Sequence, residues 1–199
     1  MKTILAIGAH YDDIEIGCGG TLLKHSENGD KIFLGITSAD ETRTGDVVVR
    51  YNEQLESAKI LGIEPFDIYR FSYFADEVHD IIGDLDQVSP DIVFAHYEFD
   101  THQDHRRASV IGQAVGRKRH ITTLFYDSGS SYNFNPNVFS MIDYDKKCKL
   151  MECVKTQIQL KAISIDIIKK KNEHWATLLT EEGEEYAEGF VVRKMKWLI

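Results

Sequence analysis

Short apolar runs of four to six residues recur along the first two thirds of the chain. They are rich in Ile, Val, Leu and Phe and do not alternate between apolar and polar positions, which is typical of strands that are covered on both faces. Strands of this kind belong to a parallel sheet. The predicted strands are Thr3–Ile7, Ile32–Thr37, Asp67–Phe71, Ile92–Ala95 and Thr122–Tyr126.

Longer segments with helical spacing lie between these runs, and most of them end at a glycine or a proline. The resulting order βαβαβαβαβ, without an internal repeat or a linker, predicts an α/β fold: a single-domain, Rossmann-like sandwich with a mostly parallel sheet. The predicted helices are Gly20–Glu27, Val47–Leu61, Asp76–Val88 and Asp104–Gly116.

The last third of the chain is less regular. Tyr144–Gln159 has the spacing of an amphipathic helix, and Tyr186–Lys194 is predicted to form a short strand. We therefore treat residues 1–199 as one domain, in which residues 1–130 form the parallel core. Residues 131–199 are expected to add elements that complete a pocket.

The composition narrows the classes of partner. Lys and Arg number 23 against 32 Asp and Glu, so the net charge of −9 argues against nucleic acid or an anionic membrane surface as the main partner. Three cysteines without a CxxC pair suggest the reducing cytoplasm, and the apolar N-terminal run is too short for a signal sequence or a membrane span. The sequence leaves open whether chains assemble into a homo-oligomer.

Two polar clusters directly follow predicted strands. The first strand runs into His10, Asp12 and Asp13, and the fourth runs into the segment His96–Arg107. Ligands of open parallel sheets bind beyond the carboxyl ends of the strands, where the strand order switches. We therefore expect the two clusters, some 90 residues apart in sequence, to share one site.

The spacing inside these clusters favours a metal. His10-x-x-Asp13 offers an imidazole and a carboxylate, and His102-x-x-His105 offers two imidazoles. Two histidines and one carboxylate, with one position left for water, form a ligand set of catalytic zinc. Asp12, beside the ligand Asp13, is placed to take a proton from water. If His102 is not the ligand of its pair, it is the natural group to stabilise negative charge in the transition state as a protonated imidazole. Asp104 or Asp100 could orient it.

Other interpretations of these residues stay open. Asp12 and Asp13 could simply cap a helix. The glycines that follow them suggest a nucleotide-binding loop, but the GxGxxG fingerprint is missing and the carboxylates would repel a pyrophosphate. His96 could support the site or merely end its strand.

Several motifs together resemble the PIG-L and LmbE-like family of zinc-dependent de-N-acetylases. They are Ala9-His-Tyr-Asp-Asp13 with Glu15 and Gly17-Cys-Gly-Gly20, Asp100-Thr-His-Gln-Asp-His105, Asn135-Pro-Asn137 and Tyr186-Ala-Glu188. The resemblance implies metal-dependent removal of an N-acetyl group from an amino sugar or its conjugate. It also implies residue roles: His10, Asp13 and His105 as ligands of Zn²⁺ or another divalent transition metal, Asp12 as general base, His102 as the transition-state histidine and Asp104 as its helper.

Three further residues are expected to contact the substrate. Arg50 resembles a family arginine that faces the pocket, Tyr11 stands where the family usually has proline, and His96 follows the fourth strand. Many relatives also carry a histidine near Lys155-Thr-Gln157, where this chain has none, so substrate choice is left open.

Two alternatives compete with deacetylation. One is another metal-dependent hydrolase, acting on a different amide or a phosphoester, although a two-metal phosphoesterase would need more carboxylates than the two clusters offer. The other is a non-catalytic metal- or sugar-binding protein, which would have no need of Asp12.

Overall fold

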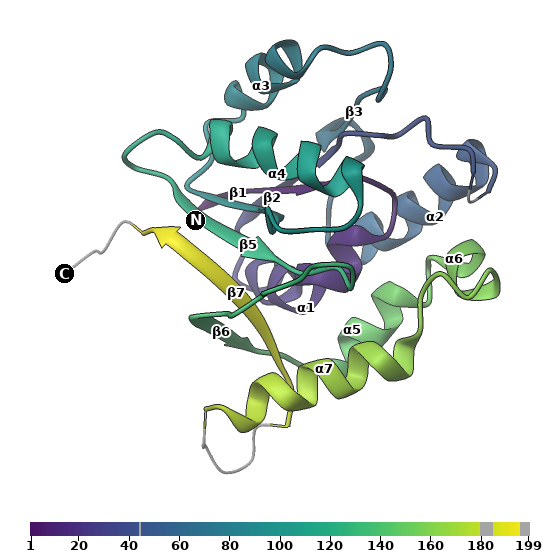
Figure 1. Ribbon diagram of the computed structural model, residues 1–199, viewed down its shortest axis with the longest axis vertical. Coiled ribbons are helices and arrows are strands. Elements are labelled where there is room, and N and C mark those ends of the chain that lie inside the picture. The colour runs from purple at the N-terminus through teal and green to yellow at the C-terminus, as the bar shows by residue number, and fades with distance from the viewer. Residues whose placement is uncertain (44, 180–184, 196–199) are drawn as a thin grey trace.

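The computed structural model describes residues 1–43, 45–179 and 185–195 as an α/β sandwich around one sheet (Figure 1). The strand order is β3-β2-β1-β4-β5-β7-β6, and the first five of these strands are parallel. β7 runs antiparallel to both β5 and β6. The strands are β1 Thr3–Gly8, β2 Lys31–Ile36, β3 Ile68–Arg70, β4 Ile92–His96, β5 Thr122–Tyr126, β6 Val138–Met141 and β7 Ala187–Lys194.

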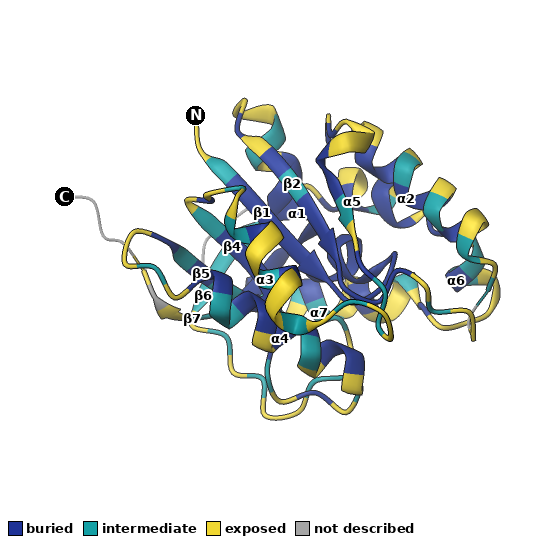
Figure 2. Ribbon diagram, turned by 90° about the horizontal axis from the view of Figure 1, so that it is seen from above, coloured by how far each residue is buried: buried dark blue, intermediate teal, exposed yellow. Residues whose placement is uncertain are grey.

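Helices cover both faces of the sheet because the strands are apolar on both faces. Along β1, Ile4 and Ala6 pack into one core with α1, α2 and α5, whereas Leu5 and Ile7 pack into the other with α3 and α4. Figure 2 shows the buried central strands between these layers. The helices are α1 Asp13–Glu27, α2 Val47–Ile60, the short 3-10 helix η1 Pro65–Asp67, α3 Val78–Asp86, α4 Gln103–Val115, α5 Tyr144–Met151, α6 Lys155–Gln159 and α7 Ile165–Thr177.

The predicted fold class is confirmed, and the structure corrects several elements. α1 begins at Asp13, seven residues before the predicted start at Gly20. Asp12 is therefore the N-cap residue, and Asp13 and Glu15 lie in the first turn of the helix. The predicted helix Tyr144–Gln159 consists of α5 and α6. α7 and β6 were not predicted; both pack against β7. Among the described residues, no helix is long and apolar enough to cross a membrane.

Candidate active site

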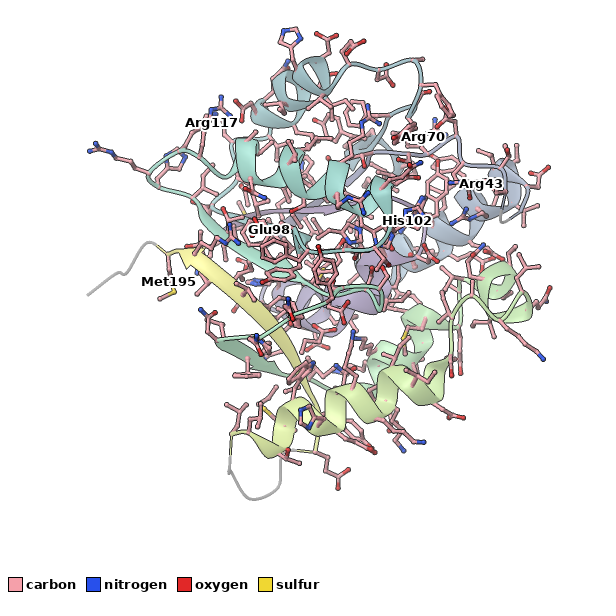
Figure 3. All side chains as sticks on the ribbon, in the orientation of Figure 1. Arg43, Arg70, Glu98, His102, Arg117 and Met195 are labelled. Carbon is pink, nitrogen blue, oxygen red and sulfur yellow. The ribbon has the colours of Figure 1, made fainter. Side chains whose placement is uncertain are left out.

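A cavity of about 490 Å³ opens at the carboxyl end of the sheet. Its wall contains residues from both predicted clusters, so the expectation that the loops after β1 and β4 share one edge is confirmed. Figure 3 shows His102 and Arg43 lying on the same side of the molecule. The lining residues are His10, Asp12, Asp13, Ile16, Glu41, Arg43, Arg50, His102, His105, Ser128, Gly129, Ser130, Gln157, Ala162 and Ile163.

Three buried side chains in this cavity form a group suited to a metal ion. One nitrogen or oxygen atom from each of His10, Asp13 and His105 lies within 4.8 Å of the others. Nε2 of His105 is 3.3 Å from Oδ1 of Asp13, and Nδ1 of His10 is 3.5 Å from Oδ2 of the same carboxylate. Two imidazoles and one carboxylate match the donor set of a catalytic divalent cation.

Hydrogen bonds to neighbouring residues leave one potential ligand atom of His105 and one of Asp13 available for a metal ion. Nδ1 of His105 lies 3.1 Å from Oδ2 of Asp100, so the ring hydrogen placed there leaves the lone pair on Nε2 for a cation. Oδ2 of Asp13 accepts hydrogen bonds from the backbone N–H groups of Ala9 and His10, at 3.0 and 2.8 Å. Its Oδ1 therefore remains directed toward His105.

The carboxylates of the site favour the binding of a positive charge. Burial alone would lower the pKa of His10, but hydrogen bonds with Asp104 and Asp13 raise it to about 10. Burial would likewise raise the pKa of Asp13, but the imidazoles of His105 and His96 hold it well below its usual value. A protonated His10 thus offsets part of the carboxylate charge, and a divalent cation would take over that role. The residues present fit the metal that the sequence predicts.

Asp12 lies beside this group but has different surroundings. Burial, followed by repulsion from Asp13, raises the pKa of Asp12 to about 7. Its nearest cation is Arg50, whose Nη2 is 3.6 Å from Oδ1 of Asp12. Arg50 is only 2% exposed, and its Nη1 lies 3.0 Å from Glu41 Oε2. A buried carboxylate with a pKa near neutrality is suited to accept and return a proton.

His102 faces the cavity from the start of α4. Its Nδ1 accepts a hydrogen bond from the backbone N–H of Asp104 at 3.2 Å, which caps the helix and places the ring hydrogen on Nε2. Burial, followed by repulsion from His105 and His10, lowers the pKa of His102. The structure therefore presents His102 as a neutral N–H donor, whereas we expected a protonated imidazole.

The sequence of the chain also matches a described family. The profile of PIG-L, GlcNAc-PI de-N-acetylase, matches residues 5–115, which is more than half of the chain. The chain belongs to the PIG-L family. A relative of this PIG-L chain is YaiS, an uncharacterized deacetylase of Escherichia coli K12. The two chains are 30% identical over 153 residues, which cover 71% of this chain and 82% of YaiS.

Two solved structures share the fold of this PIG-L chain. The N,N'-diacetylchitobiose deacetylase from Pyrococcus horikoshii has a TM-score of 0.79 at 22% identity and covers 96% of this chain and 83% of its own. GalB, the 4-carboxy-2-hydroxymuconate hydratase from Pseudomonas putida KT2440, has a TM-score of 0.78 at 20% identity. The match covers 100% of this chain and 99% of GalB. Because a deacetylase and a hydratase share this architecture, the fold alone does not fix the reaction.

Two residues expected to contact the substrate of this PIG-L protein lie outside the cavity wall. Tyr11 is 3% exposed and points into the core, where its ring lies 5.9 Å from that of Tyr51. His96 is fully buried and stacks on His105 at 4.1 Å, with Nε2 3.1 Å from Oδ2 of Asp13. His96 therefore supports two of the predicted ligands and does not form a substrate-binding wall.

Asp104 also differs from the expectation. Its Oδ2 lies 3.0 Å from Nε2 of His10, so its carboxylate orients a predicted ligand and not His102. The other candidate helper, Asp100, accepts a hydrogen bond from Ser130 and contacts His105. The backbone of Asp104, and neither carboxylate, fixes the ring of His102.

The sequence analysis missed several residues of the cavity. Glu41 bridges Arg50 and Arg43, with Oε1 3.1 Å from Nε of Arg43. Ser128–Ser130 follow β5, and Gln157 lies on α6. The loop after β5 was predictable, because it leaves the carboxyl end of a parallel strand just as the two recognised clusters do.

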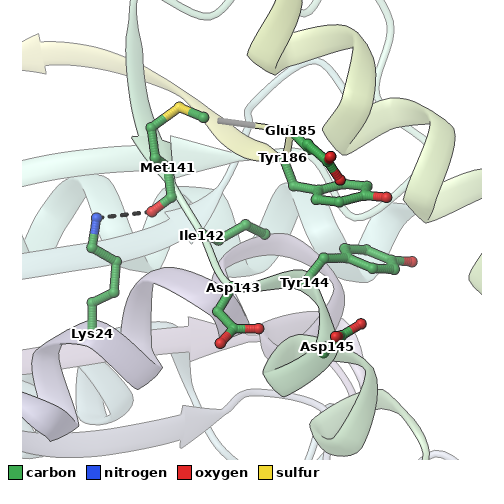
Figure 4. A pocket seen from close by; sticks show the side chains of 8 residues that line it. All are labelled: Lys24, Met141, Ile142, Asp143, Tyr144, Asp145, Glu185 and Tyr186. Atoms are coloured by element: carbon green, nitrogen blue, oxygen red, sulfur yellow. Dashed lines mark hydrogen bonds between the residues drawn. The ribbon is translucent and has the colours of Figure 1, made fainter. Parts of the chain in front are cut away.

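A second large cavity, of about 570 Å³, lies between α1, β6 and α5 (Figure 4). There Lys24 Nζ donates to the carbonyl of Met141 at 2.8 Å, and Asp143 caps α5. Its lining contains no histidine, and none of its residues belongs to a metal-ligand group among the described residues. The chemistry of the PIG-L chain is therefore concentrated at the carboxyl end of the sheet.

Proposed function

We propose that the protein is a metal-dependent deacetylase, which hydrolyses the N-acetyl or other N-acyl group of an amino sugar or amino-sugar conjugate. The observation that carries the proposal is that Asp12 lies directly beside the group His10, Asp13 and His105 in one cavity. His10, Asp13 and His105 would hold Zn²⁺ or another divalent transition metal. Such a cation, when bound, supplies Lewis-acid polarisation of the acyl group and acidification of water.

The side chains of this chain have separate tasks. Asp12 takes a proton from the attacking water and returns it to the leaving amine, a task that its raised pKa supports. His102 donates from Nε2 to the oxygen that becomes negative in the tetrahedral intermediate. Asp104 and His96 hold the ligands His10 and Asp13 in place.

Arg50 and the C-terminal elements bind the substrate. Arg50 lines the cavity and lies close to Asp12, so a sugar hydroxyl or acyl oxygen bound to it would sit next to the general base. Gln157, Ala162 and Ile163 line the cavity from the C-terminal part, which supports the expectation that residues 131–199 complete the pocket.

The alternatives fit less well. A two-metal phosphoesterase needs two ligand groups, but within the described ranges the other candidate groups share His10 or His105 with the first. A binding protein would not need a buried base beside its ligands. Because the hydratase GalB shares the fold, the experiment has to detect hydrolysis of the amide itself.

The test is amine release from N-acetylated amino sugars by metal-stripped protein, with and without added zinc. Zinc should restore turnover in the wild type. D12N should keep about one metal ion per chain but lose turnover by about 10²- to 10⁴-fold, the usual worth of a general base. D13N should lose metal and turnover together. The exposed His79 offers a matched control, H79A, which should behave as the wild type. Equal metal loss in both aspartate variants, or full turnover in D12N, would contradict the assigned roles.

A further inference from the structure

A smaller cavity of about 190 Å³ adjoins the one just described. Glu41 and Arg43 line both cavities, and Asp104, which lines the smaller one, contacts His10 in the larger. The two cavities therefore adjoin at the side chains of Glu41 and Arg43, close to a predicted metal ligand. The residues that line it are Asp40, Glu41, Thr42, Arg43, Tyr73, Phe74, Gln103 and Asp104.

The loop after β3 presents an aromatic ring to this cavity. Phe74 is 91% exposed, which is unusual for so large an apolar side chain. The loop that carries it is well anchored. Its ring meets that of Tyr73 edge to face at 5.1 Å, and the guanidinium of Arg107 lies over Tyr73 at 4.8 Å. Asp40 accepts hydrogen bonds from the hydroxyl of Ser72 and the backbone N–H of Tyr73. The backbone that carries the exposed ring is thus fixed before any ligand arrives.

The charges of the smaller cavity select against anions. Three carboxylates line it, those of Asp40, Glu41 and Asp104. Its cation, Arg43, already lies 3.1 Å from Glu41 and 3.8 Å from Asp104. A phosphate or carboxylate would meet net negative charge here. Carboxylates instead accept hydrogen bonds from hydroxyl groups, and Gln103 and Thr42 add further polar atoms.

We propose that this cavity binds a neutral sugar ring that is linked to the acylated sugar. The apolar face of the ring would stack on Phe74, and its hydroxyls would reach the surrounding carboxylates. The inference rests on the proposed deacetylase function and narrows it. The substrate is a disaccharide or longer glycan, and not a free monosaccharide, a nucleotide sugar or a phosphoinositol conjugate.

The first experiment compares kcat/KM for N,N'-diacetylchitobiose with that for N-acetylglucosamine. In the wild type the disaccharide should be preferred by about tenfold or more, as expected for one aromatic stacking contact with accompanying hydrogen bonds. F74A should reduce this ratio by about tenfold, and F74Y, which keeps the ring, should retain it. Phe66 is 77% exposed and lines neither cavity, so F66A is the matched control and should leave the ratio unchanged.

Two further substrates test the chemistry of the ligand. A nucleotide-linked N-acetylglucosamine and an aryl N-acetylglucosaminide should both react less well than the disaccharide. A preference for the nucleotide sugar or for the aryl glycoside would overturn the assignment to a neutral sugar. An unchanged ratio in F74A, or an equal change in F66A, would overturn the site itself.

A binding experiment separates failure of this inference from failure of the proposed function. Metal-loaded D12N should bind the disaccharide more tightly than the monosaccharide in calorimetry, and adding F74A should abolish the difference. If neither sugar is hydrolysed by the wild type but this difference is present, the sugar site stands and the deacetylase function fails. If the two sugars bind D12N equally, the sugar site is wrong.

Discussion

At the scale of single residues, the adjacent aspartates Asp12 and Asp13 have opposite electrostatic environments. Asp13 accepts hydrogen bonds from two backbone N–H groups and lies beside the imidazoles of His96 and His105. Asp12 has a guanidinium at 3.6 Å and the charge of Asp13 as its neighbour. One carboxylate therefore stays ionised and the other holds its proton up to a pH of about 7. Such separation of pKa values assigns different tasks to two identical side chains.

This separation predicts how the metal-free protein responds to pH. Because burial and Asp13 raise the pKa of Asp12 from 3.8 to about 7, ionising Asp12 costs folding free energy. The cost is absent below the unfolded pKa of 3.8, grows as the pH rises, and is complete above about 7. D12N removes the titrating group and should make the metal-free protein more stable than the wild type at about pH 8, but not at about pH 4. Urea unfolding in the presence of a chelator measures the difference.

D13N provides the matched control with the opposite sign. The pKa of Asp13 is held below its usual value, so its carboxylate stabilises the folded protein above that value and loses this contribution as the pH falls. D13N should therefore be less stable than the wild type at about pH 8. If both variants shifted stability in the same direction, the assigned environments would be wrong.

The residue types and their spacing were enough to bring His10, Asp13 and His105 together, but not to orient their neighbours. The position of a strand's carboxyl end predicts where the following loop lies, whereas the direction of each side chain depends on the local backbone turn. Tyr11 therefore enters the core although it stands between predicted site residues. The carboxylate of Asp104 contacts His10, which is 94 residues away in sequence, and no local pattern reveals this pairing.

At the scale of elements, the parallel half of the sheet was more predictable than the C-terminal part. The strands of the parallel half are covered on both faces and have a continuous apolar pattern. α7 has a weaker pattern: its buried positions include Ile168, Asn172 and Ala176, and three consecutive lysines lie between them. A run of lysines usually indicates a solvated segment. Lys171 is in fact directed inward, where Nζ donates to the carbonyl of Asp127 at 2.8 Å.

α7 is expected to support the candidate site through this lysine. Nζ of Lys171 also lies 3.1 Å from Oδ2 of Asp127, whose Oδ1 accepts from the backbone N–H groups of Gly129 and Ser131. The hydroxyls of Ser130 and Ser131 donate to Asp100, which holds the predicted ligand His105. The lysine thus positions a loop that in turn positions a ligand.

Replacing Lys171 should therefore weaken metal binding without touching the cavity. K171M keeps much of the aliphatic stem but leaves Asp127 without its cation, and zinc affinity should fall by about tenfold, the lower range for groups that orient metal ligands. Competition with a chromophoric chelator measures this affinity. K170M, at the preceding and exposed position of the same helix, should leave the zinc affinity unchanged. Equal affinities in the two variants would show that α7 does not support the ligands.

At the scale of the whole molecule, the predicted metal would join two halves of the sheet. The strand order switches between β1 and β4: the chain moves from β1 to β2 and β3 on one side, and β4 leads to β5 on the other. The loops after β1 and β4 therefore separate and leave a crevice at the switch. His10 and Asp13 come from one side of it, and His105 from the other.

A cation bound across this crevice should stabilise the entire fold, because it binds the folded chain in preference to the unfolded one. At a free zinc concentration of about 100 times Kd, linkage gives about 2.7 kcal/mol. For a domain of this size, each kcal/mol raises Tm by roughly 2–4 °C, so zinc should raise Tm by about 5–10 °C over the chelated protein. D13N lacks one ligand and should show little of this rise in a thermal scan. Equal shifts in D13N and the wild type would mean that zinc binds elsewhere, whereas a shift confined to the wild type ties the stability of both halves to the three ligands at their junction.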